Sequence, residues 1–364
     1  MPKENYNYHR STLQPDKYIN ELNHEINNYC KENSLNTPEA KEQLISRLLR
    51  RTGTAAFQGA SRLEGGPFGA MLVDFKTEDG IPKVVGFGTN HVVLNSDPSA
   101  HAEMIAIRDA SERLKRTDLS DLTLITSCEC CPMCLSAATG CKVDKIYFAA
   151  TRKDAANVGF SDEDQYRLMT VGGIEQHAKK VEEKDKASTE AKLNGHNAVV
   201  IVNHNGQKYS YYGDYKKTNN SDPTDLPTVQ AIKNACKGLA ELHSKPVFHL
   251  PEDTILISHD MPHPMSLITA DWARIGRVRG QEADKPEQDS PNKNTDNIIY
   301  INDKPETMQI RNEQGQTSHV EPEKVWKEIA NPSAIHLSKN LGHAHTVAFK
   351  EWNRLINTGF MPRY

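Results

Sequence analysis

Two short clusters of metal-binding side chains constrain this chain more than any other feature of its sequence. Cys131 and Cys134 are separated by two residues, so on a helix their sulfur atoms project from the same face and can bind one tetrahedral ion. His101 supplies a third ligand, and Glu103 follows two residues later. Three protein ligands leave the fourth position to water, as in a catalytic zinc site. Zinc lowers the pKa of such a water from about 15.7 to about 7, and Glu103 would carry its proton.

Both clusters are predicted to lie at helix starts. Asp97 suits an N-cap and Pro98 suits a first helical position, which puts the His-x-Glu cluster in the opening turns of a helix. Residues 122–126 are rich in β-branched side chains and predict a strand, and the turn after it delivers Cys131 to a second helix start. Two helix N-termini would therefore face one ion.

The flanking segments alternate between helical and strand patterns. Thr37 is a suitable N-cap ahead of Pro38, and an apolar stripe follows at Leu44, Ile45, Leu48 and Leu49, which predicts an amphipathic helix. Further strands are predicted at 71–73, 84–87 and 145–149, the first two joined as a hairpin. This alternation predicts an α/β sandwich.

Composition narrows the class of protein. A chain of 364 residues is long enough for two domains, and 37% hydrophobic with 25% charged residues is ordinary for a water-soluble protein. No apolar run approaches a membrane span, and the first residues lack the apolar core of a signal peptide. Four of the seven cysteines fall within 128–134, which favours metal binding in a reducing compartment, so we expect a cytoplasmic protein. The net charge of -4 disfavours nucleic acid as a partner.

A closed structural zinc site is the competing interpretation of the same residues. It needs a fourth ligand, which Cys128 or Cys130 can supply. The carboxylate two residues after His101, and the strand between the two clusters, favour the catalytic site.

With these residues in hand, the chain resembles the cytidine deaminase superfamily and, within it, the guanine deaminases. Most of the shared stretches are also found in tRNA adenosine deaminases, whereas Thr126–Glu129 and the segment 154–162 are typical of guanine deaminase. The resemblance covers about residues 57–170 and rests on Gly65–Ala70, Asn90, Asp97–Glu103, Thr126–Glu129, Cys131–Leu135, Asp154–Ala156 and Gly159–Asp162.

The resemblance implies a three-layer α/β/α sandwich with a mixed sheet, a zinc cofactor and a small-molecule purine substrate. It implies zinc ligation by His101, Cys131 and Cys134, with Glu103 as general acid and base. This chain has Cys130 where the family has proline, which loosens the turn before the ligands and leaves a spare thiol beside the metal.

The same resemblance implies the substrate contacts. Asn90 would hold a polar edge of the purine, and Asp162 would accept hydrogen bonds from the N–H groups of guanine. Phe68 and Ala102 would also contact the substrate. Outside this pattern, Asn90 is equally a capping residue and Asp162 a solvated loop acid.

The second half of the chain looks like a degenerate copy of the first. Residues 255–258 correspond to 123–126, residues 262–267 to 130–135, and 222–224 to 97–99. In this copy Leu226 and Thr228 replace the His-x-Glu pair, and His263 and Ser266 replace the two cysteines. The second half is therefore predicted to be catalytically inert.

The predicted organisation follows from this repeat. The two copies would form a pseudo-dimer within one chain, and further oligomerisation is left open. We predict a polar extension at 1–36, a catalytic domain at 37–175, a charged linker at 176–196 and a degenerate domain at 197–364.

The predicted function is hydrolytic deamination of a purine base, with guanine giving xanthine and ammonia. The alternatives are deamination of another base or nucleoside, of the tRNA adenosine or cytosine type, and a non-catalytic zinc-stabilised scaffold. Phe349 and Trp352 would lie on one face of a terminal helix, which we expect to cross to the first half and shield the zinc site. A terminal helix that only caps the second domain is the alternative.

Overall fold

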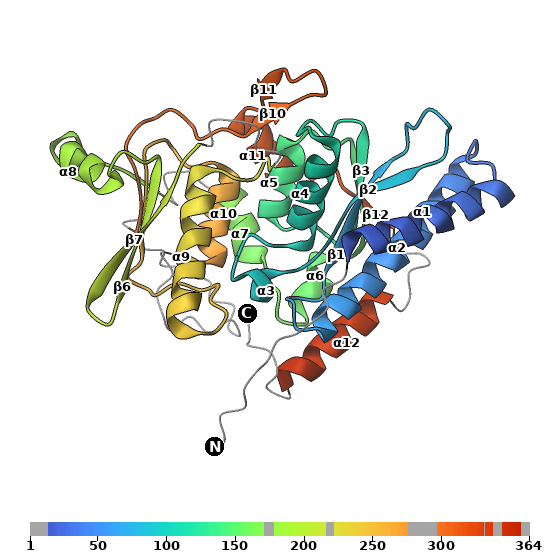
Figure 1. Cartoon of the computed structure of the whole chain (residues 1–364), viewed down its shortest axis with the longest axis horizontal. Coiled ribbons are helices and arrows are strands. Elements are labelled where there is room, and N and C mark those ends of the chain that lie inside the picture. The colour runs from blue at the N-terminus through green and yellow to red at the C-terminus, as the bar shows by residue number, and fades with distance from the viewer. Residues whose placement is uncertain are drawn as a thin grey trace.

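Two five-stranded sheets flank a central layer of helices in the computed structural model (Figure 1). Within the residues it describes, every helix is too short or too polar to cross a bilayer. The structure describes residues 14–170, 178–215, 222–275, 297–330, 332–337 and 344–357.

The first sheet contains the four strands predicted from the sequence. β1 pairs antiparallel with both β2 and β3, and β3 pairs parallel with β4, so the sheet is mixed. A short strand from the C-terminal part, β12, extends the parallel edge beside β4. In the order of the sheet, the strands are β12 (Ile335–His336), β4 (Lys145–Ala150), β3 (Leu122–Cys128), β1 (Gly69–Asp74) and β2 (Lys83–Thr89).

Helices cover both faces of this sheet and give the predicted three-layer sandwich. On one face, α2 (Pro38–Ser61) buries all four residues of its predicted apolar stripe, and the Thr37 side chain caps it by accepting a hydrogen bond from the Ala40 N–H. α1 (Pro15–Glu32) packs beside β2. The other face carries α4 (Ala102–Leu114) and α5 (Pro132–Gly140), and the short helices are α3 (Val92–Asn95), α6 (Arg152–Ala156) and α7 (Glu163–Thr170).

The close packing of α4 on β2 depends on glycine. A Cβ atom at Gly88 would lie 2.4 Å from the carbonyl oxygen of Ala102, so only glycine allows this approach. The first turn of α4, which carries Glu103, is thereby held against the sheet.

The predicted start of α4 was wrong by one turn. The helix begins at Ala102 and not at Pro98, with His101 as its N-cap. The carboxylate of Asp97 accepts hydrogen bonds from the backbone N–H of Ser99 at 2.8 Å and from its hydroxyl at 2.7 Å. Asp97 therefore closes a separate turn before the helix, a role in which Asp competes with helix capping.

The second sheet has the same strand order and the same strand directions as the first. β6 pairs antiparallel with β7 and β8, β8 pairs parallel with β9, and β5 lies parallel at the edge. The bounds are β5 (Lys179–Lys180), β6 (Ala198–His204), β7 (Gln207–Gly213), β8 (Ile255–Ser258) and β9 (Ile298–Tyr300), with helices α8 (Glu183–Leu193), α9 (Pro227–His243) and α10 (Pro264–Trp272).

This correspondence supports the predicted repeat at the level of local conformation. Leu226 is the N-cap of α9 with φ -68° and ψ 150°, close to the values of -67° and 158° at His101. His263 is the N-cap of α10 with φ -66° and ψ 150°, close to -68° and 165° at Cys131. The division into domains stays a prediction, and the segment predicted as a linker contains β5 and α8.

Elements from the C-terminal part of the chain pack on the first half. β12 joins the first sheet, β5 joins the second, and α12 (Ala344–Asn357) packs along α2 of the first half (Figure 1). The hairpin of β10 (Gln309–Arg311) and β11 (Thr317–His319) and the helix α11 (Pro322–Ala330) complete the described elements, and α11 packs on α5.

An arginine whose side chain is 15% exposed joins the two halves. The guanidinium of Arg108 donates to the hydroxyls of Ser99 at 2.9 Å and Thr224 at 2.8 Å. It also pairs with Asp97 at 3.6 Å and Asp222 at 3.4 Å. Because the Asp-Pro-Ser and Asp-Pro-Thr segments correspond between the halves, one cation binds both copies of the same turn.

Candidate active site

The structure brings the three predicted ligands together at two helix starts. His101 is the N-cap of α4, Cys131 is the N-cap of α5, and Cys134 lies in the first turn of α5. The His101 Nδ1 atom is 3.5 Å from the Cys131 sulfur and 3.6 Å from the Cys134 sulfur, and the two sulfurs are 3.5 Å apart. Ligands at about 2.0–2.3 Å from a tetrahedral zinc are separated by roughly 3.3–3.8 Å, so this donor set fits the ion.

The charges at this cluster suit a cation. Burial alone raises the pKa of the Cys131 thiol, but the hydrogen bond from Cys134 and the charge of His101 outweigh it and hold that pKa well below its usual value. Burial raises the pKa of Cys134 well above its usual value. One thiolate at a helix N-terminus is thus already favoured, and a metal ion would favour the second.

Glu103 lies beside the donor set and is 5% exposed. One of its oxygens accepts a hydrogen bond from the Thr126 hydroxyl at 2.9 Å, and the other lies 3.4 Å from the Cys134 sulfur. Burial and the charge of Cys131 raise the pKa of this carboxyl group. A raised pKa makes a carboxyl group a better proton acceptor than an ordinary glutamate, as a general base requires.

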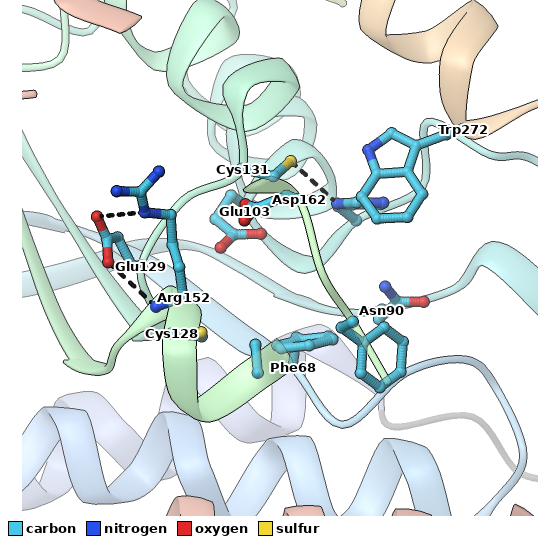
Figure 2. A pocket seen from close by; sticks show the side chains of 12 residues that line it. Phe68, Asn90, Glu103, Cys128, Glu129, Cys131, Arg152, Asp162 and Trp272 are labelled. Carbon is cyan, nitrogen blue, oxygen red and sulfur yellow. Dashed lines mark hydrogen bonds and ion pairs between the residues drawn. The ribbon is translucent and has the colours of Figure 1, made fainter. Parts of the chain in front are cut away.

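A partly open cavity lies over these groups, with about 530 Å³ of space that includes open solvent (Figure 2). Of the predicted substrate contacts, Phe68, Asn90 and Asp162 line it, whereas Ala102 is fully buried beside it and does not. The lining residues are Phe68, Asn90, His101, Glu103, Cys128, Glu129, Cys131, Arg152, Ala155, Phe160, Asp162 and Trp272.

Asn90 is oriented by the protein backbone. Its side-chain oxygen accepts hydrogen bonds from the N–H groups of Gly66 at 3.1 Å and Val92 at 3.2 Å. A Cβ atom at Gly65 would lie 2.1 Å from that oxygen, so the glycine is required for this approach. Because the oxygen is committed, the amide nitrogen is the atom that Asn90 offers to a ligand.

Asp162 supplies a second buried carboxyl group to the cavity. It is 7% exposed, and burial together with the charge of Cys131 raises its pKa to about 8. Arg152 opposes this shift. A carboxyl group with this pKa is largely protonated at neutral pH, and N–H groups of a ligand that donate to it would stabilise its carboxylate form.

Aromatic rings form one wall of the cavity, and the C-terminal helix lies behind them. Phe68 meets Phe160 edge-on with ring centroids 4.9 Å apart. Behind them, Phe349 contacts Phe68 at 6.0 Å and Trp352 contacts Phe160 at 5.0 Å. α12 thus reaches the first half as expected, but its two aromatic residues support the wall and do not line the cavity.

Trp272 is the functional candidate that the sequence did not single out. It ends α10, in the second half, and yet it lines the cavity with its ring 5.1 Å from that of His101 (Figure 2). Its indole N–H is buried and has no hydrogen-bond partner among the described residues. The one signal in the sequence is its position, because a large aromatic residue stands opposite Gly140 of the first copy.

An ion pair at the cavity was also not predicted. Arg152 contacts Glu129 through its guanidinium at 3.2 Å and its backbone N–H at 3.1 Å. The guanidinium lies over the Tyr166 ring at 3.9 Å, and the Tyr166 hydroxyl donates to the Cys130 carbonyl at 2.5 Å. The Cys130 backbone, in place of the family's proline, is thereby fixed, and its thiol is buried outside the cavity lining.

The structure also bears on the alternative of a structural zinc site in which Cys128 or Cys130 supplies the fourth ligand. Within the described part of the chain, the potential metal-binding group at this position consists of His101, Cys131 and Cys134. Neither Cys128 nor Cys130 belongs to it. The fourth direction opens on the cavity, where Glu103 also lies.

Comparisons with known proteins agree with this geometry. Residues 43–150 match the family described as cytidine and deoxycytidylate deaminase zinc-binding region. Guanine deaminase of Bacillus subtilis is 42% identical over 119 residues, which are 33% of this chain and 72% of that protein. A tRNA-specific adenosine deaminase of Buchnera aphidicola is 36% identical over 88 residues, which are 24% of this chain and 54% of that protein.

A solved structure is also similar. The crystal structure of guanine deaminase from Bacillus subtilis is 34% identical, with 42% of this chain and 94% of that chain covered and a TM-score of 0.34. The resemblance inferred from the sequence motifs is confirmed, as is zinc as the cofactor of the family. With its helix-borne His-Cys-Cys group and a match over most of a known guanine deaminase, the chain belongs to the zinc-binding family of cytidine and deoxycytidylate deaminases, which are hydrolases.

Proposed function

We propose that this chain catalyses the hydrolytic deamination of guanine to xanthine and ammonia at the site around His101, Cys131 and Cys134. The observation that carries the proposal is the cavity itself, where a proton-carrying glutamate, a metal-binding group and a buried aspartate converge on one small space. The named relatives support it, because both are deaminases and one is a guanine deaminase.

The residues of the chain divide the chemistry between them. When zinc is bound by His101, Cys131 and Cys134, it supplies Lewis-acid activation of a water molecule. Glu103 accepts a proton from that water and delivers it to the ring nitrogen beside the amine-bearing carbon, while the water oxygen bonds to that carbon. Glu103 then takes the remaining proton of the added hydroxyl group and transfers it to the amine, which leaves as ammonia when the C–N bond breaks and the new carbonyl forms. The hydrogen bond from Thr126 to one Glu103 oxygen leaves the other oxygen directed at the metal-binding group, where this transfer takes place.

Recognition of the base is assigned to Asn90 and Asp162. The free amide nitrogen of Asn90 donates to a carbonyl or ring nitrogen of the purine, and Asp162 accepts from adjacent N–H groups. Guanine presents such N–H groups on one edge, whereas adenine presents one acceptor, the ring nitrogen N1, and a C–H group at the matching positions. Asp162 thereby favours guanine over adenine, because an acceptor facing an acceptor leaves both unpaired.

The walls of the cavity contribute to binding in a different way. Phe68 and Phe160 on one side and Trp272 on the other offer apolar surface to a flat ring. Together they exclude water from the reacting atoms, which strengthens the electrostatic interactions with the site. The second half of the chain has in this view lost its own chemistry and retains a structural role at the active site of the first.

An ammonia-release screen tests the proposal. The purified protein is incubated with guanine, guanosine, adenine, adenosine, cytosine, cytidine and a tRNA anticodon stem-loop, and products are identified by chromatography. Guanine is expected to give equal amounts of xanthine and ammonia, with the other substrates much slower. Turnover of the stem-loop with none of guanine would replace the proposal by tRNA adenosine deamination, and no release from any substrate would favour a scaffold.

A further inference from the structure

A glutamate fills the position in the second half that corresponds to the metal site of the first. The carboxylate of Glu306 contacts the hydroxyl of Thr228 at 2.8 Å and that of Ser266 at 2.6 Å. It also accepts hydrogen bonds from the backbone N–H of Thr228 at 3.0 Å and of His263 at 3.2 Å. Thr228 corresponds to the base Glu103, Ser266 to the ligand Cys134 and His263 to the ligand Cys131, so the carboxylate lies between the two helix starts that carry the metal site in the first half.

The electrostatics explain why an acidic group is held here. Both sites are formed by two helix N-termini, whose exposed N–H groups favour negative charge. In the first half the cysteines supply that charge, but Leu226, His263 and Ser266 supply none. Glu306, which is 1% exposed, is the acidic side chain that contacts both helix starts. Burial raises its pKa, and the hydrogen bonds from Ser266 and Thr228 counteract that rise.

The backbone around Glu306 is fixed on both sides. Its own N–H donates to the Met261 carbonyl at 2.7 Å, and Pro305 forms a bridge with Met261. Two residues later, Met308 is fully buried against Gly140 at the end of α5. Glu306 therefore belongs to a strap that runs from the second site to the helix carrying the cysteines of the first.

α10 connects Glu306 to the active-site cavity. The helix begins at the residues that Glu306 binds, and its nine residues end at Trp272, about 12 Å away along the axis. All of its residues before Trp272 are buried, so a change in position at its start would be passed along the closely packed helix to Trp272. At its far end, the Asp271 carboxylate accepts a hydrogen bond from the Gln165 side chain at 2.9 Å.

We propose that Glu306 takes the place of a metal ion in the second half and, by fixing the start of α10, positions Trp272 over the active site of the first half. Glu306 touches neither the cavity nor the substrate, so it is a positioning residue. The effect on turnover rests on the proposed function, whereas the effect on Trp272 does not.

The test uses Glu306→Gln in protein labelled with 5-fluorotryptophan. The chain has three tryptophans, so fluorine NMR gives three resonances, assigned by single Trp→Phe variants. Glutamine keeps the shape but places an amide N–H₂ against donor groups at Thr228 or His263. We expect the Trp272 resonance to shift or broaden and that of Trp352 to stay. Glu321→Gln, an exposed position in the same half, is the matched control and should leave all resonances unchanged.

A double-mutant cycle with Trp272→Phe tests whether the effect of Glu306→Gln on kcat/KM depends on Trp272. Glu306→Gln alone should lower kcat/KM on the order of tenfold, mainly through KM, because the displaced group positions the base. In the Trp272→Phe background the same change should cost much less. Additive losses, or an unmoved Trp272 resonance in a folded Glu306→Gln protein, would overturn the proposal.

Two further comparisons make the result decisive. If Glu306→Gln does not fold, Glu306→Asp keeps the charge but shortens the side chain, and the same resonance shift is expected at smaller size. An unmoved resonance in that protein would overturn the proposal equally. If the parent protein does not deaminate guanine, the proposed function fails, and the resonance of Trp272 alone decides the role of Glu306.

Discussion

Replacing Trp272 with alanine should weaken catalysis at a site whose other lining residues all come from the first half of the chain. The structure offers two separable contributions, the aromatic face of the indole and its N–H, which is buried without a partner among the described residues. Contact between a base and an aromatic ring is worth about 1–3 kcal/mol in alanine substitutions, and a hydrogen bond adds about 0.5–1.5 kcal/mol. Trp272→Ala should therefore lower kcat/KM by roughly 10- to 1,600-fold, since the two contributions add to about 1.5–4.5 kcal/mol and each 1.4 kcal/mol is about a factor of ten.

Trp272→Phe separates the two contributions. Phenylalanine retains an aromatic face and lacks the N–H, so its loss should be limited to roughly 2- to 10-fold. Steady-state guanine turnover is measured for the parent and both variants, with zinc content and melting temperature as controls for folding. A zinc-loaded, folded Trp272→Ala protein with unchanged kcat/KM would refute the assignment of Trp272 to the active site.

Three other changes test separate parts of the structure. Asp162→Asn should lower kcat/KM for guanine roughly 5- to 150-fold, which corresponds to about 1–3 kcal/mol, because a hydrogen-bond acceptor becomes a mismatched donor. Any turnover of adenine or cytosine should fall less, and equal losses on all substrates would contradict this prediction. Arg108→Leu should lower the free energy of unfolding in urea by about 3–5 kcal/mol, because the buried Asp97 and the partly exposed Asp222 lose the cation that they share. Arg113→Leu, at a more exposed ion pair, should cost much less. Burial lowers the pKa of His263 to about 3 in the folded state. In the unfolded state the imidazole takes up a proton below about pH 6.5, so the protein loses stability as the pH falls from about 6.5 towards 3. In denaturant titrations between these pH values, the free energy of unfolding of His263→Asn should fall by about 1.4 kcal/mol less per pH unit than that of the parent protein. The same pH dependence of this free energy in both proteins would contradict the prediction.

The sequence predicts the first sheet and the metal cluster well because both depend on local patterns. Runs of β-branched and apolar residues define β1 to β4, and the spacing of Cys131 and Cys134 follows from one helical turn. The start of α4 was misplaced because Asp97 and Pro98 satisfy the rules for a helix start and a turn equally, and the bonds from Asp97 to Ser99 select the turn.

The contacts between the halves depend on non-local packing, which a sequence pattern does not encode. Trp272 lines the cavity because α10 packs on α5, and nothing in its own neighbourhood indicates this. Glu306 is similar, because it stands in an irregular segment forty residues after Ser266, the residue it contacts at 2.6 Å. The correspondence between the halves predicted that the second site had lost its ligands, but not that a carboxylate would occupy it.

The most direct test of a catalytic zinc site is the pairing of metal content with turnover in Glu103→Gln. Glu103 is placed to carry a proton and not to bind the ion, so the variant should retain one zinc per chain while guanine turnover falls at least about a hundredfold. Glu112→Gln, an exposed position on the same helix, should change neither quantity. An active Glu103→Gln protein, or a parent protein with two zinc ions per chain, would contradict a single catalytic centre in the first half.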